Sequence, residues 1–232
     1  MLLSGLIFDK INNMTITWYG QSCFRIETKG ASSTGLGQAS VLIDPFSRDI
    51  GLRPPRIKDD IVLVTHAHYD HNNLEGLNEE AFVINTPGEY ERKGIYVRGT
   101  RSYHDNSSGI ERGLNTVFIL KAEDMAICHM GDFGQTKLEE HQLEEIGDVD
   151  LLMIPVGGKY TIGSKEAVEI IGQIEPKIVI PMHYKVPSLN IDIDGPEKFT
   201  KELGLAPEKV DKFKIAKKLL PAEEIKLVMF EL

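Results

Sequence analysis

The sequence has only two cysteines, Cys23 and Cys128, and they lie far apart in the chain. Two cysteines do not make a disulfide framework, so we expect a reducing, cytoplasmic location. No apolar run approaches the roughly 20 residues that cross a bilayer, which argues against a membrane protein. Residues 1–8 are apolar but lack the basic start and the cleavage site of a signal peptide.

Positive charge is also scarce. The chain has 26 Lys and Arg against 35 Asp and Glu, a net charge of −9. An acidic protein without a basic and aromatic patch is poorly suited to nucleic acid or to anionic membranes. An anionic small molecule is still an acceptable substrate where a metal ion dominates the local field. Neither a G-x-S-x-G elbow nor a Walker loop occurs.

What the sequence does contain is an α/β pattern. Its 232 residues are 41% hydrophobic, enough for a packed core. Extended patterns that begin at residue 14 precede any helix signal and predict a sheet that starts antiparallel, and the second half alternates strands and helices. We expect one domain over residues 14–232, with residues 1–13 as an extension and Met14 as an alternative start. The predicted strands cover residues 14–19, 23–27, 41–43, 61–64, 81–84, 95–99, 115–120, 125–128, 151–154, 178–180 and 225–230.

The remaining segments carry short sequence patterns that predict loops, turns and helices. Residues 29–40 are rich in Gly and Ser and predict a long hairpin loop, and residues 86–90 predict a turn. A short helix is expected over residues 72–77, with its amides beside the loop before it. Thr136 and Glu139 form a capping-box pattern that predicts a helix ending near Gly147. Ser164 is placed to cap a helix through Ile171, and a last helix is expected from residue 194 to Gly204.

The most informative stretch follows the strand at residues 61–64. It supplies His66, His68, Asp70 and His71 within six residues. Alternation along an extended segment would place His66 and His68 on the same side. Imidazole nitrogen and carboxylate oxygen are ligands that zinc accepts. Four such groups exceed what one tetrahedral ion needs from one loop, which predicts two ions close together, each completed by ligands from elsewhere.

This stretch resembles the HxHxDH signature of the metallo-β-lactamase superfamily. His104, Asp132 and His183 fall in the order in which that superfamily supplies its remaining ligands. The resemblance implies a four-layer αββα sandwich and two divalent ions, with zinc expected first and manganese or iron as alternatives. It assigns His66, His68 and His104 to one ion, Asp70, His71 and His183 to the second, and Asp132 to a bridge between them. A metal-bound hydroxide would then be the nucleophile.

Three further segments resemble a narrower branch of the superfamily, the Zn-dependent hydrolases related to ascorbate-6-phosphate lactonase. These are residues 128–134, 155–161 and 181–184. The predicted catalytic residues are Asp70 of the signature and His129 of the first of these segments. Three roles stay open for His129: it orients a ligand, donates a proton to the leaving group, or is a core histidine. Lys159 and Tyr160 either reach an anionic substrate or are exposed loop residues. The weaker candidates are Glu89, Tyr90 and Tyr184.

The resulting hypothesis is a metal-dependent hydrolase of a small-molecule ester, lactone or phosphoester. One alternative is a metal-dependent phosphodiesterase or nuclease, against which the acidic charge and the lack of a large inserted domain count. Another is a non-catalytic protein that keeps metal for stability and binds a partner, against which the complete ligand set counts. A diiron oxidoreductase is disfavoured because those relatives have glutamate where this chain has His68. The bond that is hydrolysed and the oligomeric state are not decided by the sequence.

Overall fold

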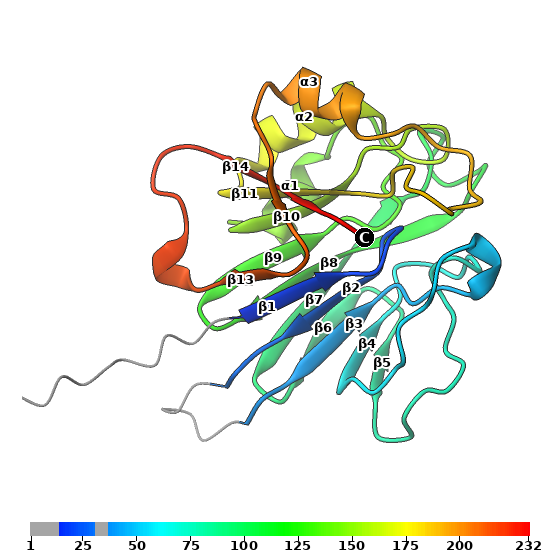
Figure 1. The fold of residues 1–232 in the computed structure, drawn as a ribbon, viewed down its shortest axis with the longest axis vertical. Coiled ribbons are helices and arrows are strands. Elements are labelled where there is room, and N and C mark those ends of the chain that lie inside the picture. The colour runs from blue at the N-terminus through cyan, green and yellow to red at the C-terminus, as the bar shows by residue number, and fades with distance from the viewer. Residues whose placement is uncertain (1–13, 31–36) are drawn as a thin grey trace, which may run out of the picture.

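The first half of the chain forms most of a six-stranded sheet in the computed structural model, which describes residues 14–30 and 37–232 (Figure 1). Every second residue of its strand β1 is fully buried, as expected for a sheet with one face in the core. The pairs β1–β2 and β2–β3 are antiparallel, and β3–β4 and β4–β5 are parallel. In spatial order the strands are β13 (Phe213–Ile215), β1 (Met14–Trp18), β2 (Phe24–Glu27), β3 (Ser40–Ile43), β4 (Ile61–Leu63) and β5 (Phe82–Ile84).

An eight-stranded sheet packs against the first. Its strands β10 and β11 are buried along their whole length, which explains why they read as continuous apolar runs. The spatial order is β12 (Glu208–Val210), β14 (Lys226–Phe230), β11 (Ile178–Met182), β10 (Leu151–Pro155), β9 (Met125–His129), β8 (Leu114–Ala122), β7 (Ile95–Tyr103) and β6 (Gly88–Arg92). A single apolar cluster, which includes Phe24, Phe118 and Ile180, fills the space between the two sheets.

The helices follow the strands of the larger sheet. The α-helices are α1 (Glu140–Ile146), α2 (Ser164–Ile174) and α3 (Glu197–Leu203), and Figure 1 shows α2 and α3 on the side of this sheet away from the smaller one. Two 3₁₀ turns, η1 (Arg48–Ile50) and η2 (Lys217–Leu219), complete the elements of the described residues. The two-sheet α/β architecture expected from the sequence is confirmed. No helix within the described ranges has the length and apolar character to cross a membrane.

Parallel strands bring chemistry-bearing residues to one edge of each sheet. In the smaller sheet, β3 ends just before Asp44 and the parallel β4 ends before His66. In the larger sheet, β9, β10 and β11 are parallel, and β11 ends just before His183. The loops that follow such strand ends are where layered α/β folds place their sites. The topology therefore gathers residues that are far apart in the sequence.

Several local expectations were wrong. Residues 72–77 are irregular apart from a turn at residues 75–76, and Asn73 donates its backbone N–H to Pro45 O (2.8 Å) and its side-chain amide to Phe46 O (3.0 Å). Residues 86–90, expected as a turn, include the start of β6, which pairs with β7. The capping box of α1 belongs to Glu139 and Gln142. Helix α2 begins at Ser164 after a Gly163 cap and runs to Ile174.

Other expectations stand in part. Gly204 caps α3 as expected, and Gly147 follows α1. The short strands β12 and β13 lie within residues 208–215 and were not expected, because each has only three residues; β12 is largely exposed, whereas Phe213 and Ile215 of β13 are buried. The proposed extension, residues 1–13, lies outside the described residues. So do residues 31–36 of the predicted hairpin loop.

Candidate metal centre

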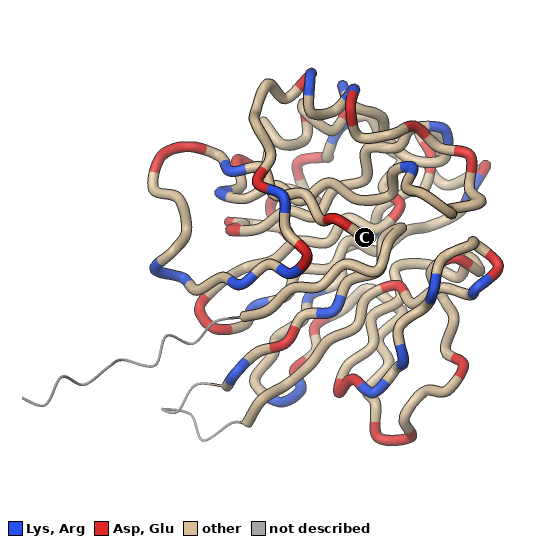
Figure 2. Tube along the Cα trace, in the orientation of Figure 1, with Lys and Arg blue, Asp and Glu red and all other residues tan. Residues whose placement is uncertain are grey.

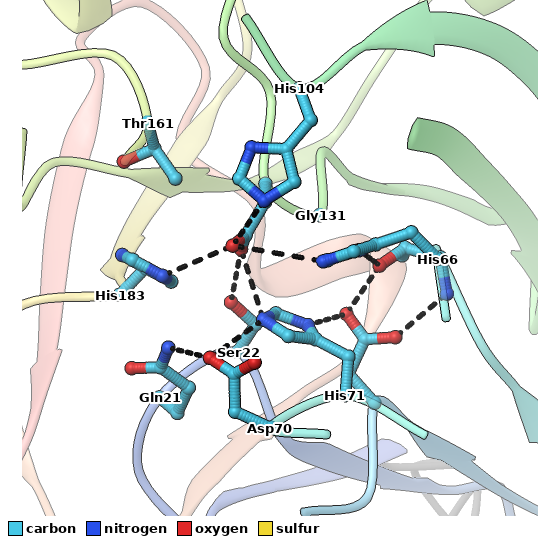
Figure 3. Close-up of polar contacts among 12 residues, drawn as sticks. Gln21, Ser22, His66, Asp70, His71, His104, Gly131, Thr161 and His183 are labelled. Atoms are coloured by element: carbon cyan, nitrogen blue, oxygen red, sulfur yellow. Dashed lines mark hydrogen bonds and ion pairs between the residues drawn. The ribbon is translucent and has the colours of Figure 1, made fainter. Parts of the chain in front are cut away.

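Seven side chains of the kind that bind metals converge at the shared edge of the two sheets. Figure 3 shows His66, Asp70, His71, His104 and His183 among them. They form two groups, and within each group one ligand atom of every residue lies within 4.8 Å of the others. The first group is His66, His68 and His104, and the second group is Asp70, His71, Asp132 and His183. All seven residues that the sequence singled out as metal ligands are thus brought together.

Turns in the local backbone direct these side chains into the site. His66 and His68 lie on the same side, as expected, with ring centroids 4.6 Å apart, but they follow the end of β4 at Leu63 and are not part of an extended strand. The backbone N–H groups of His71 and Asn72 both donate to His68 O, at 3.0 Å, and close the turn that directs Asp70 and His71 inward. His183 adopts a left-handed conformation (φ +51°) directly after β11.

Asp132 contacts both groups. Its Oδ2 lies 3.2 Å from Nε2 of His104 and 3.2 Å from Nε2 of His183, and its Oδ1 lies 3.2 Å from Nε2 of His71. Ligands held about 2.1 Å from a tetrahedral ion are about 3.4 Å apart. The separations around Asp132 are therefore close to those that shared coordination requires.

The donor atoms also fit metal ions. Nε2 of His66 and Nε2 of His71 are buried and, among the described residues, no group meets hydrogen-bond geometry with either, although Asp132 Oδ1 lies 3.2 Å from that of His71. The other nitrogen of each ring is fixed: Nδ1 of His66 lies 2.9 Å from Oγ1 of Thr65, and Nδ1 of His71 lies 2.9 Å from Oδ2 of Asp44. A histidine with one nitrogen anchored and the other buried without a partner is arranged as a metal ligand. The nitrogen and oxygen donor set suits zinc, iron and manganese.

The buried charges of the site favour the binding of a cation. Burial would raise the pKa of Asp132, but His183 and His71 hold it well below its usual value. Burial would lower the pKa of His71, but Asp132 and Asp44 outweigh it and raise that pKa well above the usual value. Burial, then His71, lowers the pKa of His66 to about 2, so this ring is neutral. The buried carboxylates thus need positive charge, which divalent ions supply.

Asp44 is a site residue that the sequence analysis missed. It is fully buried and adopts a left-handed conformation (φ +48°). Besides His71, it accepts hydrogen bonds from the backbone N–H and from Oγ1 of Thr65, both at 2.8 Å. Thr65 in turn contacts His66, so one carboxylate orients a histidine of each group. The available signal was its position at the end of a strand, next to the strand that precedes the signature.

His129 lies outside both groups, although it was predicted as catalytic. Its ring is fully buried: Nε2 lies 2.8 Å from the carbonyl oxygen of Ser22, and Nδ1 accepts the N–H of Gly131 at 3.2 Å. Both nitrogens therefore contact backbone groups. This arrangement favours a role in holding the turn before Asp132, since no ring nitrogen faces the two groups.

The other candidates contact protein groups. The Lys159 ammonium pairs with Asp192, and the Arg112 guanidinium lies 5.0 Å from the ring centre of Tyr160.

Tyr184 is buried against Trp18, with ring centres 5.0 Å apart. Glu89 pairs with Arg98 at 2.8 Å, and the Tyr90 hydroxyl lies 2.8 Å from Oγ1 of Thr86. None of them belongs to either group.

Charge is mixed along the fold. Figure 2 shows lysine and arginine interspersed with aspartate and glutamate, without a continuous basic stripe along the described trace in this view. The two cysteines are buried and unpaired. His141 is exposed on α1, where its Nδ1 lies 3.3 Å from Oε2 of Glu139.

Comparison with known proteins gives a consistent result. The family model described as the beta-lactamase superfamily domain matches residues 15–183. A metal-dependent hydrolase from Thermoplasma acidophilum is 31% identical over 217 residues, which cover 82% of this chain and 90% of that protein. One from Pyrococcus horikoshii is 30% identical over 241 residues, which cover 91% and 99%. The crystal structure of a protein assigned as a Zn-dependent hydrolase of the metallo-β-lactamase superfamily, from Thermotoga maritima, has a TM-score of 0.75 and 33% identity, and covers 94% of this chain and 98% of its own.

The matched residues make up most of the chain, so the chain belongs to the metallo-β-lactamase superfamily. Within that superfamily it is a metal-dependent hydrolase, like the relatives with which it aligns over most of its length. Its superfamily membership was predicted from the HxHxDH signature and is confirmed. The narrower resemblance to ascorbate-6-phosphate lactonase stays a prediction.

Proposed function

We propose that the chain binds two divalent metal ions and hydrolyses a small-molecule ester, lactone or phosphoester. The observation that carries this proposal is the pair of ligand groups that meet at Asp132. Each group offers three or four donors, which is the number that one ion takes from a protein when a position is left open. Zinc is the first candidate, and manganese and iron suit the same donors.

Divalent ions at such a site supply Lewis acidity and lower the pKa of water towards neutrality. The chain's own residues would fix the geometry. Asp132 would bridge the ions, His66, His68 and His104 would hold one of them, and Asp70, His71 and His183 would hold the other. Asp44 and Thr65 would keep the rings of His71 and His66 turned towards the ions.

A small molecule, and not a nucleic acid, is supported as the substrate by the charge of the protein. The net charge of −9 and the mixed charges of Figure 2 disfavour a nucleic-acid backbone as the ligand. Tyr69, next to Asp70, has 62% of its surface exposed, so an aromatic side chain is available beside the site. The expected cytoplasmic location stays a prediction.

The test is a substrate panel run on protein loaded separately with Zn²⁺, Mn²⁺ and Fe²⁺, with metal content measured in the same samples. We expect about two equivalents of metal and turnover of at least one lactone, ester or phosphoester. Turnover confined to nucleic acids would favour the nuclease alternative. One equivalent or less after reconstitution would contradict the two-ion centre. Two equivalents without hydrolysis of any of these bonds, together with tight binding of a protein, would favour the partner-binding alternative.

A further inference from the structure

Gln21 lies in the turn between β1 and β2, and its side chain points to the second group (Figure 3). The residue is fully buried. Its Nε2 donates to Oδ2 of Asp70 at 2.9 Å, while its Oε1 is buried without a hydrogen-bond partner in residues 14–30 and 37–232. The amide thus has one polar contact within the described residues, and that contact is with a member of the second group.

The backbone of the same residue contacts another member of this group. The carbonyl oxygen of Gln21 accepts the backbone N–H of His183 at 3.0 Å and the indole N–H of Trp18 at 3.0 Å. His183 follows β11 of the larger sheet, whereas Asp70 follows β4 of the smaller one. Gln21 therefore links two residues that come from different sheets.

The next residue of the turn extends the contacts. Ser22 Oγ lies 3.4 Å from Oδ1 of Asp132, and the Ser22 carbonyl oxygen lies 2.8 Å from Nε2 of His129. Residues 21 and 22 together contact three of the four residues of the second group. None of their hydrogen bonds in the described ranges reaches a residue of the first group. Gln21 itself is thus placed to act on the second group, whereas Ser22 contacts Asp132, the residue that would bridge both ions.

The local conformation of Gln21 is energetically unfavourable by itself. Gln21 has a φ of +52°, in the left-handed region that residues with a Cβ disfavour. Burying an amide oxygen without a partner adds a further cost. An observed outlier of this kind is a reason to look for function. The contacts of Gln21 with Asp70 and His183 indicate such a function.

We propose that Gln21 is a positioning residue that holds Asp70 through its amide and His183 through its carbonyl oxygen, so that the second group binds its ion. This inference rests on the two-ion centre proposed above. Losing a partner that orients a ligand lowers metal affinity by about 10–100-fold. Gln21→Met removes the amide at similar volume and leaves the backbone contact, so we expect the ion of the second group to bind about 10–100-fold more weakly. Binding at the first group should not change.

The experiment is a competitive titration of metal-free protein with Zn²⁺ alone, against a chelating dye, for wild type and Gln21→Met. Gln142→Met is the matched control, because Gln142 is also buried but donates to Arg101 O and to Gln135, away from both groups. We expect two high-affinity equivalents for wild type and the control, and one for Gln21→Met, whose second equivalent returns at excess Zn²⁺. Recovery at excess metal distinguishes loss of positioning from loss of fold.

A double-mutant cycle assigns the lost ion. If Gln21 acts through Asp70, adding Gln21→Met to Asp70→Ala should change Zn²⁺ binding little, whereas adding it to His68→Ala should weaken both sites. Two unchanged equivalents in Gln21→Met would overturn this inference and leave the two-ion centre intact. A single equivalent in wild type would overturn both. Equal loss in Gln142→Met, or loss at both sites without recovery, would overturn the positioning role.

Discussion

Oδ2 of Asp44 lies 2.9 Å from Nδ1 of His71, inside a site where both side chains have no exposed surface. Of the seven proposed ligands, His71 is the one whose anchoring partner is itself a buried carboxylate. That carboxylate also accepts two hydrogen bonds from Thr65, which contacts His66. Asp44 thus connects the two groups without being a member of either.

Asp44→Asn should weaken metal binding while the sandwich stays folded. An amide at this position no longer balances a charged or metal-bound imidazole, and one of its polar atoms becomes a donor facing Thr65 or His71. We expect metal affinity to fall by about 10–100-fold, measured by titration with Zn²⁺. Asp59→Asn is the control, since Asp59 is a buried carboxylate that pairs with Arg25 away from the site. Equal effects of both substitutions on affinity would argue against orientation by Asp44.

Asp132→Ala should disturb both ion sites at once. Its two oxygens lie 3.2 Å from histidines of both groups, so no single ligand replaces it. We expect loss of hydrolysis of any substrate found and a fall in metal content below one equivalent. Far-UV circular dichroism would verify the fold. His129→Ala should cost less, because both ring nitrogens of His129 bond to backbone groups and not to a proposed ligand. Two retained ions in Asp132→Ala would rule out the bridge.

The metal ligands were more predictable from sequence than the residues that hold them. His66, His68, Asp70 and His71 stand in one short pattern, and residue type alone suggests their chemistry. His104, Asp132 and His183 were placed by their order along the chain. Asp44, Thr65 and Gln21 have no such pattern, because their roles depend on strand ends and turns that become neighbours only in the folded sandwich.

The fold was predictable to a similar degree. Strands with alternating or continuous apolar residues, such as β1 and β10, were found within a residue or two of their ends. The short strands β12 and β13 were missed, because pairing with neighbours defines them and their own residues do not. The expected helix after the signature failed for the same reason: Asn73 finds hydrogen-bond partners at Pro45 and Phe46, far from its own segment.

Gly134→Ala should destabilise the loop that carries His104. A Cβ at Gly134 would lie 2.3 Å from the carbonyl carbon of His104 and 2.4 Å from the backbone nitrogen of Asp105. Backbone atoms this close must move, and overpacking of this kind costs about 1–3 kcal/mol of unfolding free energy. Urea denaturation of the metal-free protein measures it.

Gly172→Ala is the matched control for that substitution. Gly172 lies inside α2, and nothing stands within 4 Å of an added Cβ. Because alanine favours a helix interior over glycine, this variant should gain about 1 kcal/mol. An unaffected Gly134→Ala would contradict the close approach of residue 134 to the His104 segment, and a destabilised Gly172→Ala would contradict the open space beside residue 172.

Asp150 should make stability depend on pH in the acid range. It precedes β10 and receives hydrogen bonds from Lys217 Nζ (2.8 Å), from the backbone N–H of Ala126 (3.0 Å) and from Lys177 Nζ (3.0 Å). Burial would raise its pKa, but these contacts, led by Lys217, lower the pKa below the usual value. A carboxyl whose pKa is lower when folded stabilises the protein above its unfolded pKa of about 3.9.

That contribution is lost as pH falls through the folded pKa of Asp150, because protonation removes the charge that the two lysines face. Asp150→Asn should therefore be less stable than wild type at pH 6, and the gap should narrow as the pH approaches 3. Urea unfolding of metal-free protein at stepwise pH measures both curves, so that metal release does not contribute. Asp192→Asn is the control, since Asp192 pairs with Lys159 on the surface and exposed pairs contribute little. A gap between wild type and Asp150→Asn that stays constant from pH 6 to pH 3 would contradict the role of the Asp150 charge.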